Sequence, residues 1–220
     1  MKHDDDTNHW LLLQLADSAF PTGGFAHSGG LEAAWQHGEI CEAADLVSYL
    51  ETNLWQIASS SVPFVRAGHT APAQILEWNL HCDAFLSNHV ANRASRLQGR
   101  AFLNSATRIF AVEIGLETHS DPCHFAPVFG AVTRSLSLSR SMAEQVFFFQ
   151  SLRSLVAAAV RLGIVGPMEA QAIQYRFSAR SREILDSVKD HSVNDAVMTA
   201  PLSEIWQGSH DRLYSRLFQT

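Results

Sequence analysis

Hydrophobic residues recur along this chain at the spacing of an α-helix rather than that of a strand. Leu46, Leu50, Leu54 and Ile57 fall at i, i+4, i+8 and i+11, which places them on one face of a helix. No stretch alternates apolar and polar residues for long, and no Asn-Gly or Asp-Gly pair marks a hairpin turn. The pattern predicts an all-α protein: a single helical-bundle domain of about eight to ten helices.

The clearest predicted helix lies in the second half of the chain. Residues 139–162 are mostly apolar with little polar face, so this helix should lie centrally and be covered on several sides. Ser139 or Ser141 is expected to cap its start. Gly163 ends it, and Pro167 begins a partner helix, which together predict an αα-hairpin.

The two ends of the chain are predicted to differ from its middle. Residues 1–9 contain the run Asp4-Asp5-Asp6 and are expected to form a disordered N-terminus. Residues 10–200 carry the helical pattern and form the domain. Residues 201–220 mix apolar and polar positions around one glycine, and end in residue types that are enriched at binding hot spots. We expect them to be a C-terminal tail that docks onto a partner.

Composition and charge narrow the class of protein. The chain has 220 residues, 46% hydrophobic and 17% charged, as an ordinary globular protein does. Its net charge of −6 and its lack of a basic run argue against nucleic acid or an anionic membrane as the main partner. Three isolated cysteines and the lack of a visible signal peptide lead us to expect a reducing, cytoplasmic location.

A glycine-rich segment near the N-terminus is the first candidate for chemistry. Four glycines within eight residues, from Gly23 to Gly30, imply unusual backbone torsions or very close contacts. The segment lacks the spacing and the lysine of a P-loop. Ser28 beside His27 suggests a serine nucleophile. The GxSxG elbow of serine hydrolases, however, follows a strand, and no strand is predicted before this segment. The alternative is a tight turn into a helix, with Ser28 as N-cap and Glu32 near the positive end of the helix dipole.

Histidine and cysteine residues suggest a metal site at one loop. His119, Cys123 and His124 are close in sequence and could bind a borderline metal such as nickel or zinc. The alternative is that these histidines are solvated or hydrogen-bonded, and we favour it over a bound metal.

Arginine residues form two groups at helical spacing. Arg96 and Arg100 are four residues apart, as are Arg176 and Arg180, so each pair shares a helical face. Such pairs could receive carboxylates of a partner protein, because arginine is favoured in interface ion pairs. Surface arginines with local acidic partners are the alternative.

Four segments, in chain order, resemble the UreF family of urease accessory proteins, in its plant-like variant. The first is residues 11–32, with an LLQL start, a Pro-Thr-Gly-Gly-Phe turn and Gly30-Leu31-Glu32. The second is Ser95-Arg96-Leu97-Gln98-Gly99, and the third is His124-Phe125-Ala126-Pro127-Val128-Phe129-Gly130. The last is His210-Asp211 followed by Tyr214-Ser215-Arg216-Leu217-Phe218. No single motif is specific, but four in register are.

The resemblance implies an all-helical protein that is not an enzyme. It would act as a nickel-insertion chaperone that bridges UreD (also called UreH) and the GTPase UreG, and would regulate GTP-dependent nickel delivery to the urease apoprotein. It would form a homodimer within that complex and bind no cofactor itself, because nickel and GTP are handled by the partners. The residues expected to bind partners are Phe25, His27, Ser28, Glu32, Arg96, Gln98, His210, Tyr214, Ser215, Arg216, Leu217 and Phe218. The alternatives are a metallochaperone using His119, Cys123 and His124, and a serine hydrolase.

One position departs from the pattern of the resembled family. Where many relatives have a bulky residue after the serine, this chain has Gly29. We expect the extra glycine to loosen the start of the following helix by about 1 kcal/mol relative to alanine.

Overall fold

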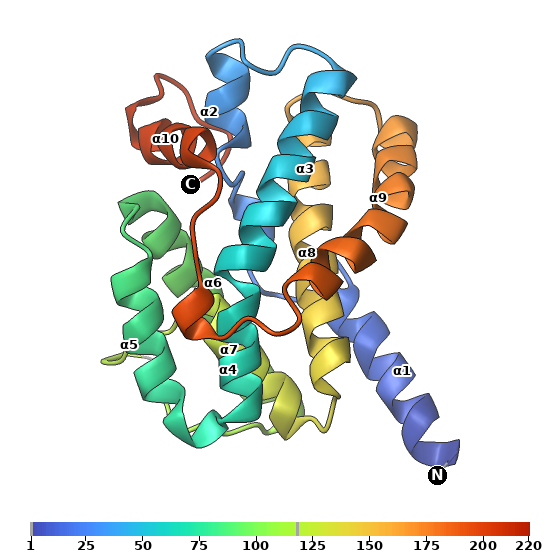
Figure 1. The fold of residues 1–220 in the computed structure, drawn as a ribbon, viewed down its shortest axis with the longest axis vertical. Coiled ribbons are helices and arrows are strands. Elements are labelled where there is room, and N and C mark those ends of the chain that lie inside the picture. Colours follow the sequence, from blue (N-terminus) through green and yellow to red (C-terminus); the bar gives the residue numbers. More distant parts are fainter. Residues whose placement is uncertain (1, 118) are drawn as a thin grey trace.

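Helices make up all of the regular secondary structure in residues 2–117 and 119–220, the parts that this computed structural model describes (Figure 1). The α-helices are α1 (Lys2–Ala16), α2 (Leu31–Gln36), α3 (Ala43–Ser60), α4 (Val62–Thr70), α5 (Ile75–Phe85), α6 (His89–Phe110), α7 (Phe125–Ser135), α8 (Arg140–Arg161), α9 (Pro167–Ser187) and α10 (Pro201–Ser209). Short 3₁₀ turns lie at Gly24–Ala26, Pro72–Gln74, Val193–Asp195 and His210–Arg212. The prediction of a single all-α domain with about eight to ten helices is confirmed for the described residues. No helix of the described residues is long and apolar enough to cross a membrane.

The hairpin of α8 and α9 follows the sequence signals closely. Ser139 is the N-cap of α8, and its hydroxyl accepts a hydrogen bond of 3.2 Å from the Met142 amide. Gly163 has a φ of 73°, the left-handed conformation that ends a helix. Pro167 is the first residue of α9. Helix α8 packs against α1, α3, α4, α7 and α9, so its predicted central position is confirmed (Figure 1).

Aromatic side chains fill the centre of the bundle around α7. Phe129 of α7 stacks on Phe102 of α6 with 5.1 Å between the ring centroids. Phe125 lies 5.4 Å from Phe147 of α8, again between centroids. Phe102 and Phe129 are fully buried, so α6, α7 and α8 share one apolar core.

Glycine residues let the backbone of α7 lie directly against its neighbours. A Cβ atom at Gly130 of α7 would overlap the carbonyl oxygen of Val65 in α4, and one at Gly68 of α4 would overlap that of Pro127. A Cβ atom at Gly99 of α6 would overlap the carbonyl oxygen of Cys123. The glycines of the second and third sequence motifs are therefore packing residues.

The start of the chain differs from its prediction. The acidic run predicts disorder over residues 1–9, whereas the structure describes residues 2–9 as part of α1, with Met1 outside the described residues. Leu15 is buried and Leu11 and Leu12 pack against the core, which fixes the C-terminal half of this helix. Extending an existing helix costs much less than starting a new one, so the helix continues toward the N-terminus.

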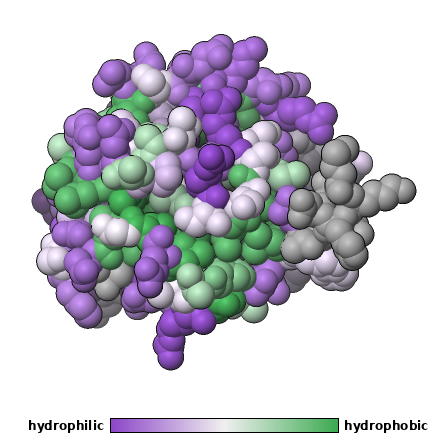
Figure 2. Space-filling view, turned by 90° about the horizontal axis from the view of Figure 1, so that it is seen from below, coloured by the Kyte–Doolittle hydropathy of each residue, from purple (hydrophilic) through white to green (hydrophobic). Residues whose placement is uncertain are grey.

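Apolar side chains also reach the surface. Viewed from the end of the molecule where α1 projects, they form a band between polar margins (Figure 2). Large exposed apolar residues of the described chain include Trp10 and Leu13 of α1, Met168 and Tyr175 of α9, and Leu202 and Ile205 of α10.

We expect Gly130→Ala to destabilise the fold by about 3 kcal/mol, because the new methyl group must push the α4 backbone away from α7. Gly166→Ala is the matched control, since no heavy atom lies within 4 Å of a Cβ atom at that position. Urea unfolding of both variants measures the difference. Equal stability of the two variants would show that the helices do not touch there.

Candidate functional site

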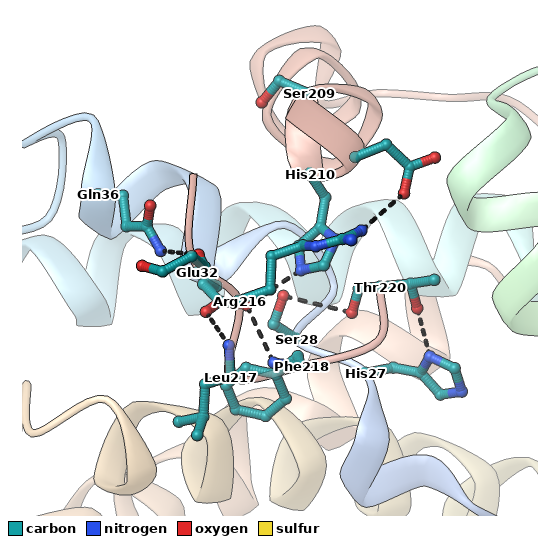
Figure 3. A network of polar contacts seen from close by, with 12 residues as sticks. His27, Ser28, Glu32, Gln36, Ser209, His210, Arg216, Leu217, Phe218 and Thr220 are labelled. Carbon is teal, nitrogen blue, oxygen red and sulfur yellow. Dashed lines mark hydrogen bonds and ion pairs between the residues drawn. The ribbon is translucent and has the colours of Figure 1, made fainter. Parts of the chain in front are cut away.

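The end of the chain, residues 210–220, folds back onto the glycine-rich residues 23–30 (Figure 3). We call these two parts the C-terminal segment and the glycine-rich turn. The Gln219 amide donates to the carbonyl oxygen of Ala26 at 2.8 Å, and the Ser28 amide donates to the main-chain oxygen of Thr220 at 2.7 Å. The Gln36 side chain donates to the carbonyl oxygen of Ser215 at 2.9 Å. The first and last sequence motifs, which lie at opposite ends of the chain, therefore form one structural unit.

A buried carboxylate lies at the centre of this unit. Glu32 is 1% exposed, and it accepts hydrogen bonds from the amides of Leu217 at 2.6 Å and Phe218 at 3.2 Å. Its second oxygen is also 3.0 Å from Nε2 of the fully buried His210. Three donors compensate the cost of burying the negative charge. We call Glu32, His210, Leu217 and Phe218 the tail clamp.

The tail clamp changes the expected roles of Glu32 and Ser28. Gly30, with a φ of 91°, precedes α2 as its N-cap, in place of Ser28. Glu32 does lie in the first turn of α2, but its carboxylate binds the C-terminal segment. Gly29 also has a positive φ, of 62°, where a residue with a Cβ atom is disfavoured by about 1–2 kcal/mol. Gly29 lies in the turn before α2, and its backbone conformation there favours glycine. The expected loosening of the helix start therefore does not apply at this position.

His27 and Ser28 both bind the last residue of the chain. The Ser28 hydroxyl is buried and lies 3.5 Å from the main-chain oxygen of Thr220, to which it donates. His27 Nδ1 forms a hydrogen bond with the Thr220 hydroxyl. Burial lowers the pKa of His27 to about 4, and the positive charge of Arg93 adds to the effect. Each side chain is bound to Thr220, and this arrangement gives the serine-hydrolase alternative no support.

Phe218 anchors the segment to α8. Its ring is buried, and the guanidinium of Arg161 lies 4.1 Å from the ring centroid, a cation–π contact. The same guanidinium donates a hydrogen bond to the carbonyl oxygen of Phe25. Arg161, at the end of α8, thus connects the glycine-rich turn with the C-terminal segment.

The twelve residues expected to bind partners separate into three groups by exposure. Those buried within the chain are His27, Ser28, Glu32, His210 and Phe218. Those exposed are Phe25, Tyr214, Ser215, Arg216 and Leu217, and those half-buried are Arg96 and Gln98. Phe25 is 73% exposed and Tyr214 is fully exposed. The buried group shapes the surface on which the exposed group lies, and direct partner contact by any of the twelve stays a prediction.

The half-buried Gln98 lines a cavity next to the glycine-rich turn. This cavity has a volume of about 580 Å³, and Phe25, Asn53 and Gln150 also line it. It was not expected from the sequence, because its walls come from α3, α6, α8 and the turn, which only the tertiary fold brings together.

His124 connects the second and third motifs inside the protein. Its Nε2 lies 2.9 Å from a carboxylate oxygen of Asp83, and its Nδ1 lies 3.1 Å from the Ser95 hydroxyl. Its amide donates to the Asn79 side chain at 2.6 Å. Ser95, His124 and Asp83 are connected in the order of a hydrolase triad. The imidazole, however, is fully buried, and the Ser95 hydroxyl accepts a hydrogen bond from the Phe125 amide, so the three side chains have a structural role. These bonds hold the start of α7 against α5 and α6.

The three weak metal candidates are not brought together. His119 is exposed, Cys123 is fully buried, and the His124 ring is bound to Asp83 and Ser95. Burial raises the pKa of the Cys123 thiol, which disfavours the thiolate that would bind a metal. Within residues 2–117 and 119–220, no group of three or more His, Cys, Asp or Glu side chains is placed to hold a metal ion. The metallochaperone alternative therefore has no preformed site in the described part of the chain.

Comparison with known proteins gives a consistent result. The UreF family model matches residues 40–178. The urease accessory protein F of Arabidopsis thaliana is 36% identical over 95% of this chain and 91% of its own length. That of Oryza sativa subsp. indica is 32% identical over 96% of this chain and 85% of its own. UreF of Mesorhizobium japonicum is 28% identical over 95% of both chains. The higher identity to these plant proteins agrees with the predicted plant-like variant.

Removing the charge of the tail clamp should loosen the C-terminal segment. We expect Glu32→Gln to lower the free energy of unfolding by about 2 kcal/mol, because an amide cannot accept from all three donors. Limited proteolysis should then cut within residues 211–220 sooner than in the wild type. Glu39→Gln, at an exposed position, is the control. An unchanged cleavage rate in Glu32→Gln would contradict the clamp.

Burial of His27 should make stability depend on pH. Its pKa is about 4 in the folded protein against 6.5 for the free side chain, so the unfolded chain takes up the proton first as the pH falls. The contribution of neutral His27 is therefore present above pH 6.5 and lost as the pH falls toward 4. Urea unfolding across this range should give a flatter pH dependence for His27→Gln than for the wild type. The exposed-site variant His37→Gln should keep the wild-type slope, and equal slopes for all three proteins would refute the effect.

Proposed function

The chain belongs to the UreF family of urease accessory proteins, and on that premise we propose that it is a non-catalytic scaffold for nickel insertion. In this proposal it bridges UreD (UreH) and the GTPase UreG in the cytoplasm and regulates GTP-dependent nickel delivery to the urease apoprotein. Nickel and GTP are bound by the partner proteins. Two copies of the chain form a homodimer within the complex.

The observation that best supports the proposal is the exposed surface that the tail clamp creates. Phe218 and Glu32 hold the C-terminal segment from the inside, while Tyr214, Arg216 and Leu217 remain exposed. Phe25, connected to the same unit through Arg161, is also exposed. Aromatic residues and arginine are enriched at the energetic centres of protein interfaces. A surface that is fixed before binding also loses less conformational entropy when a partner docks.

The exposed apolar residues elsewhere support an assembly with more than one partner. Apolar side chains are exposed on α1, α9 and α10, and Figure 2 shows an apolar band at the end from which α1 projects. Large exposed apolar patches on a globular protein are typical of surfaces that a partner or a second copy of the chain covers.

Truncating the tail arginine should weaken recruitment of UreG. Arg216 is exposed, and its contact with Asp211 is 3.5 Å long, so Arg216→Ala should change stability by less than about 0.5 kcal/mol. A pull-down with UreG and UreD should show at least about tenfold weaker retention of UreG.

Arg182→Ala on α9 is the matched control, because it removes the same charge from an exposed position outside the C-terminal segment. Retention of UreG by Arg216→Ala at the wild-type level would remove Arg216 from the interface. A wild-type chain that binds neither partner would overturn the scaffold function as a whole.

A further inference from the structure

Four basic residues of α6 lie on one face of the helix. His89, Arg93, Arg96 and Arg100 are spaced at i, i+4, i+7 and i+11. They line a surface pocket of about 430 Å³, together with Leu97. The side chains of Arg93 and Arg96 are 42% and 37% exposed, so both can reach a bound molecule.

The C-terminal motif extends this basic face. Asp211 accepts a bidentate pair of hydrogen bonds from Arg93, at 2.7 and 3.0 Å. The same carboxylate lies 3.3 Å from Nε2 of His89 and 3.5 Å from Nη1 of Arg216. Arg93 and Arg216 are thus joined through one carboxylate. We call Arg93, Arg96, Arg100 and Arg216 the arginine strip.

The arginine strip carries more positive charge than its own chain neutralises. Asp211 serves Arg93 and Arg216, and Asp83 lies 3.8 Å from Arg96 while it also binds His124. Arg100 forms no ion pair with the described residues, and its buried Nε has no hydrogen-bond partner among them. Four guanidinium groups therefore meet two carboxylates, on a chain whose net charge is −6. This local excess is the opposite of the overall charge.

We propose that the arginine strip binds an acidic segment of a protein partner, one with closely spaced Asp or Glu carboxylates. The inference rests on the proposed scaffold function and names the chemistry of one of its contacts. A planar guanidinium matches a carboxylate in a two-point contact, and the Arg93–Asp211 pair shows this geometry on the strip itself. Leu97 and Leu217, both partly exposed, add apolar contact area beside the charges.

A peptide segment fits this surface better than a nucleic acid does. A long polyanion would meet the negative charge of the rest of the protein, whereas a short segment experiences mainly the charges within a Debye length, about 8 Å at physiological salt. Asp211 occupies the Arg93 end of the strip, so it competes with a partner's carboxylate there. Removing this internal carboxylate should therefore strengthen binding, while removing arginines should weaken it.

The test uses the full-length protein and a fluorescein-labelled hexaglutamate peptide, with binding followed by fluorescence anisotropy at low salt. Arg96→Gln with Arg100→Gln should weaken binding by at least about tenfold. Asp211→Asn should tighten it severalfold. Arg182→Gln on α9 removes one charge from an exposed site off the strip and should leave affinity within about twofold of the wild type. Arg96→Gln alone, at a half-exposed position, gives a second variant if the double one does not fold.

Two results in this assay would overturn the inference. One is equal affinity of the wild type and the arginine variants for hexaglutamate. The other is tighter binding of a single-stranded oligonucleotide or of inorganic pyrophosphate than of hexaglutamate, because either would make phosphate the preferred ligand.

A pull-down with UreG and UreD separates failure of this inference from failure of the scaffold function. If the wild type retains its partners and the strip variants retain them equally well, the strip is not a docking site and the scaffold function stands. If the wild type retains neither partner but hexaglutamate binding still depends on the strip, the scaffold function fails and the acidic-ligand site stands.

Discussion

The buried carboxylate of Glu32 is the interaction on which the functional surface depends. It is almost inaccessible to solvent, and its three donors are the His210 ring and the amides of Leu217 and Phe218. All three come from the C-terminal segment. If that segment left, the carboxylate would lose all three donors at once and only water could replace them, so the contacts form or break together. The turn and the tail therefore keep their places together, and the exposed residues between the fixed points are held in one arrangement.

The four sequence motifs contribute to this arrangement in two different ways. Gly99 and Gly130, in the two central motifs, allow backbones to touch, and His124 ties α7 to α5 and α6. The terminal motifs meet each other through the tail clamp. Many of the motif residues are therefore internal. Others, such as Phe25 and Arg216, are exposed, where a partner of a urease accessory protein could contact them.

Local signals in the sequence predicted the fold well. The apolar periodicity gave the all-α class, and Ser139, Gly163 and Pro167 gave the limits of the α8–α9 hairpin, because caps and helix ends depend on neighbouring residues. Helix α7 is harder to predict from local signals, because Pro122 and Pro127 are typical of a loop. Pro127 nevertheless lies in the first turn of that helix, where a missing amide costs little.

The site was predicted less completely, for a physical reason. The sequence placed Glu32 correctly in the first turn of a helix, but its donors are 178 to 186 residues away along the chain. No local pattern reports such a contact. The same limit applies to His124, which reads as a metal candidate in sequence and binds Asp83 and Ser95 in the fold. Residue types indicated which segments are functionally important. Only the tertiary structure showed which residues of those segments are exposed and which are buried.

Amide hydrogen exchange at Leu217 and Phe218 in the isolated wild-type chain tests the central claim most directly. Both residues lie close to the end of the chain, where amides usually exchange at the rate of an unfolded peptide. Because the two amides donate to a buried carboxylate, we predict protection well above that of the neighbouring exposed Arg216. Exchange of both at the unfolded-peptide rate would show that the tail is not clamped, and would contradict the account.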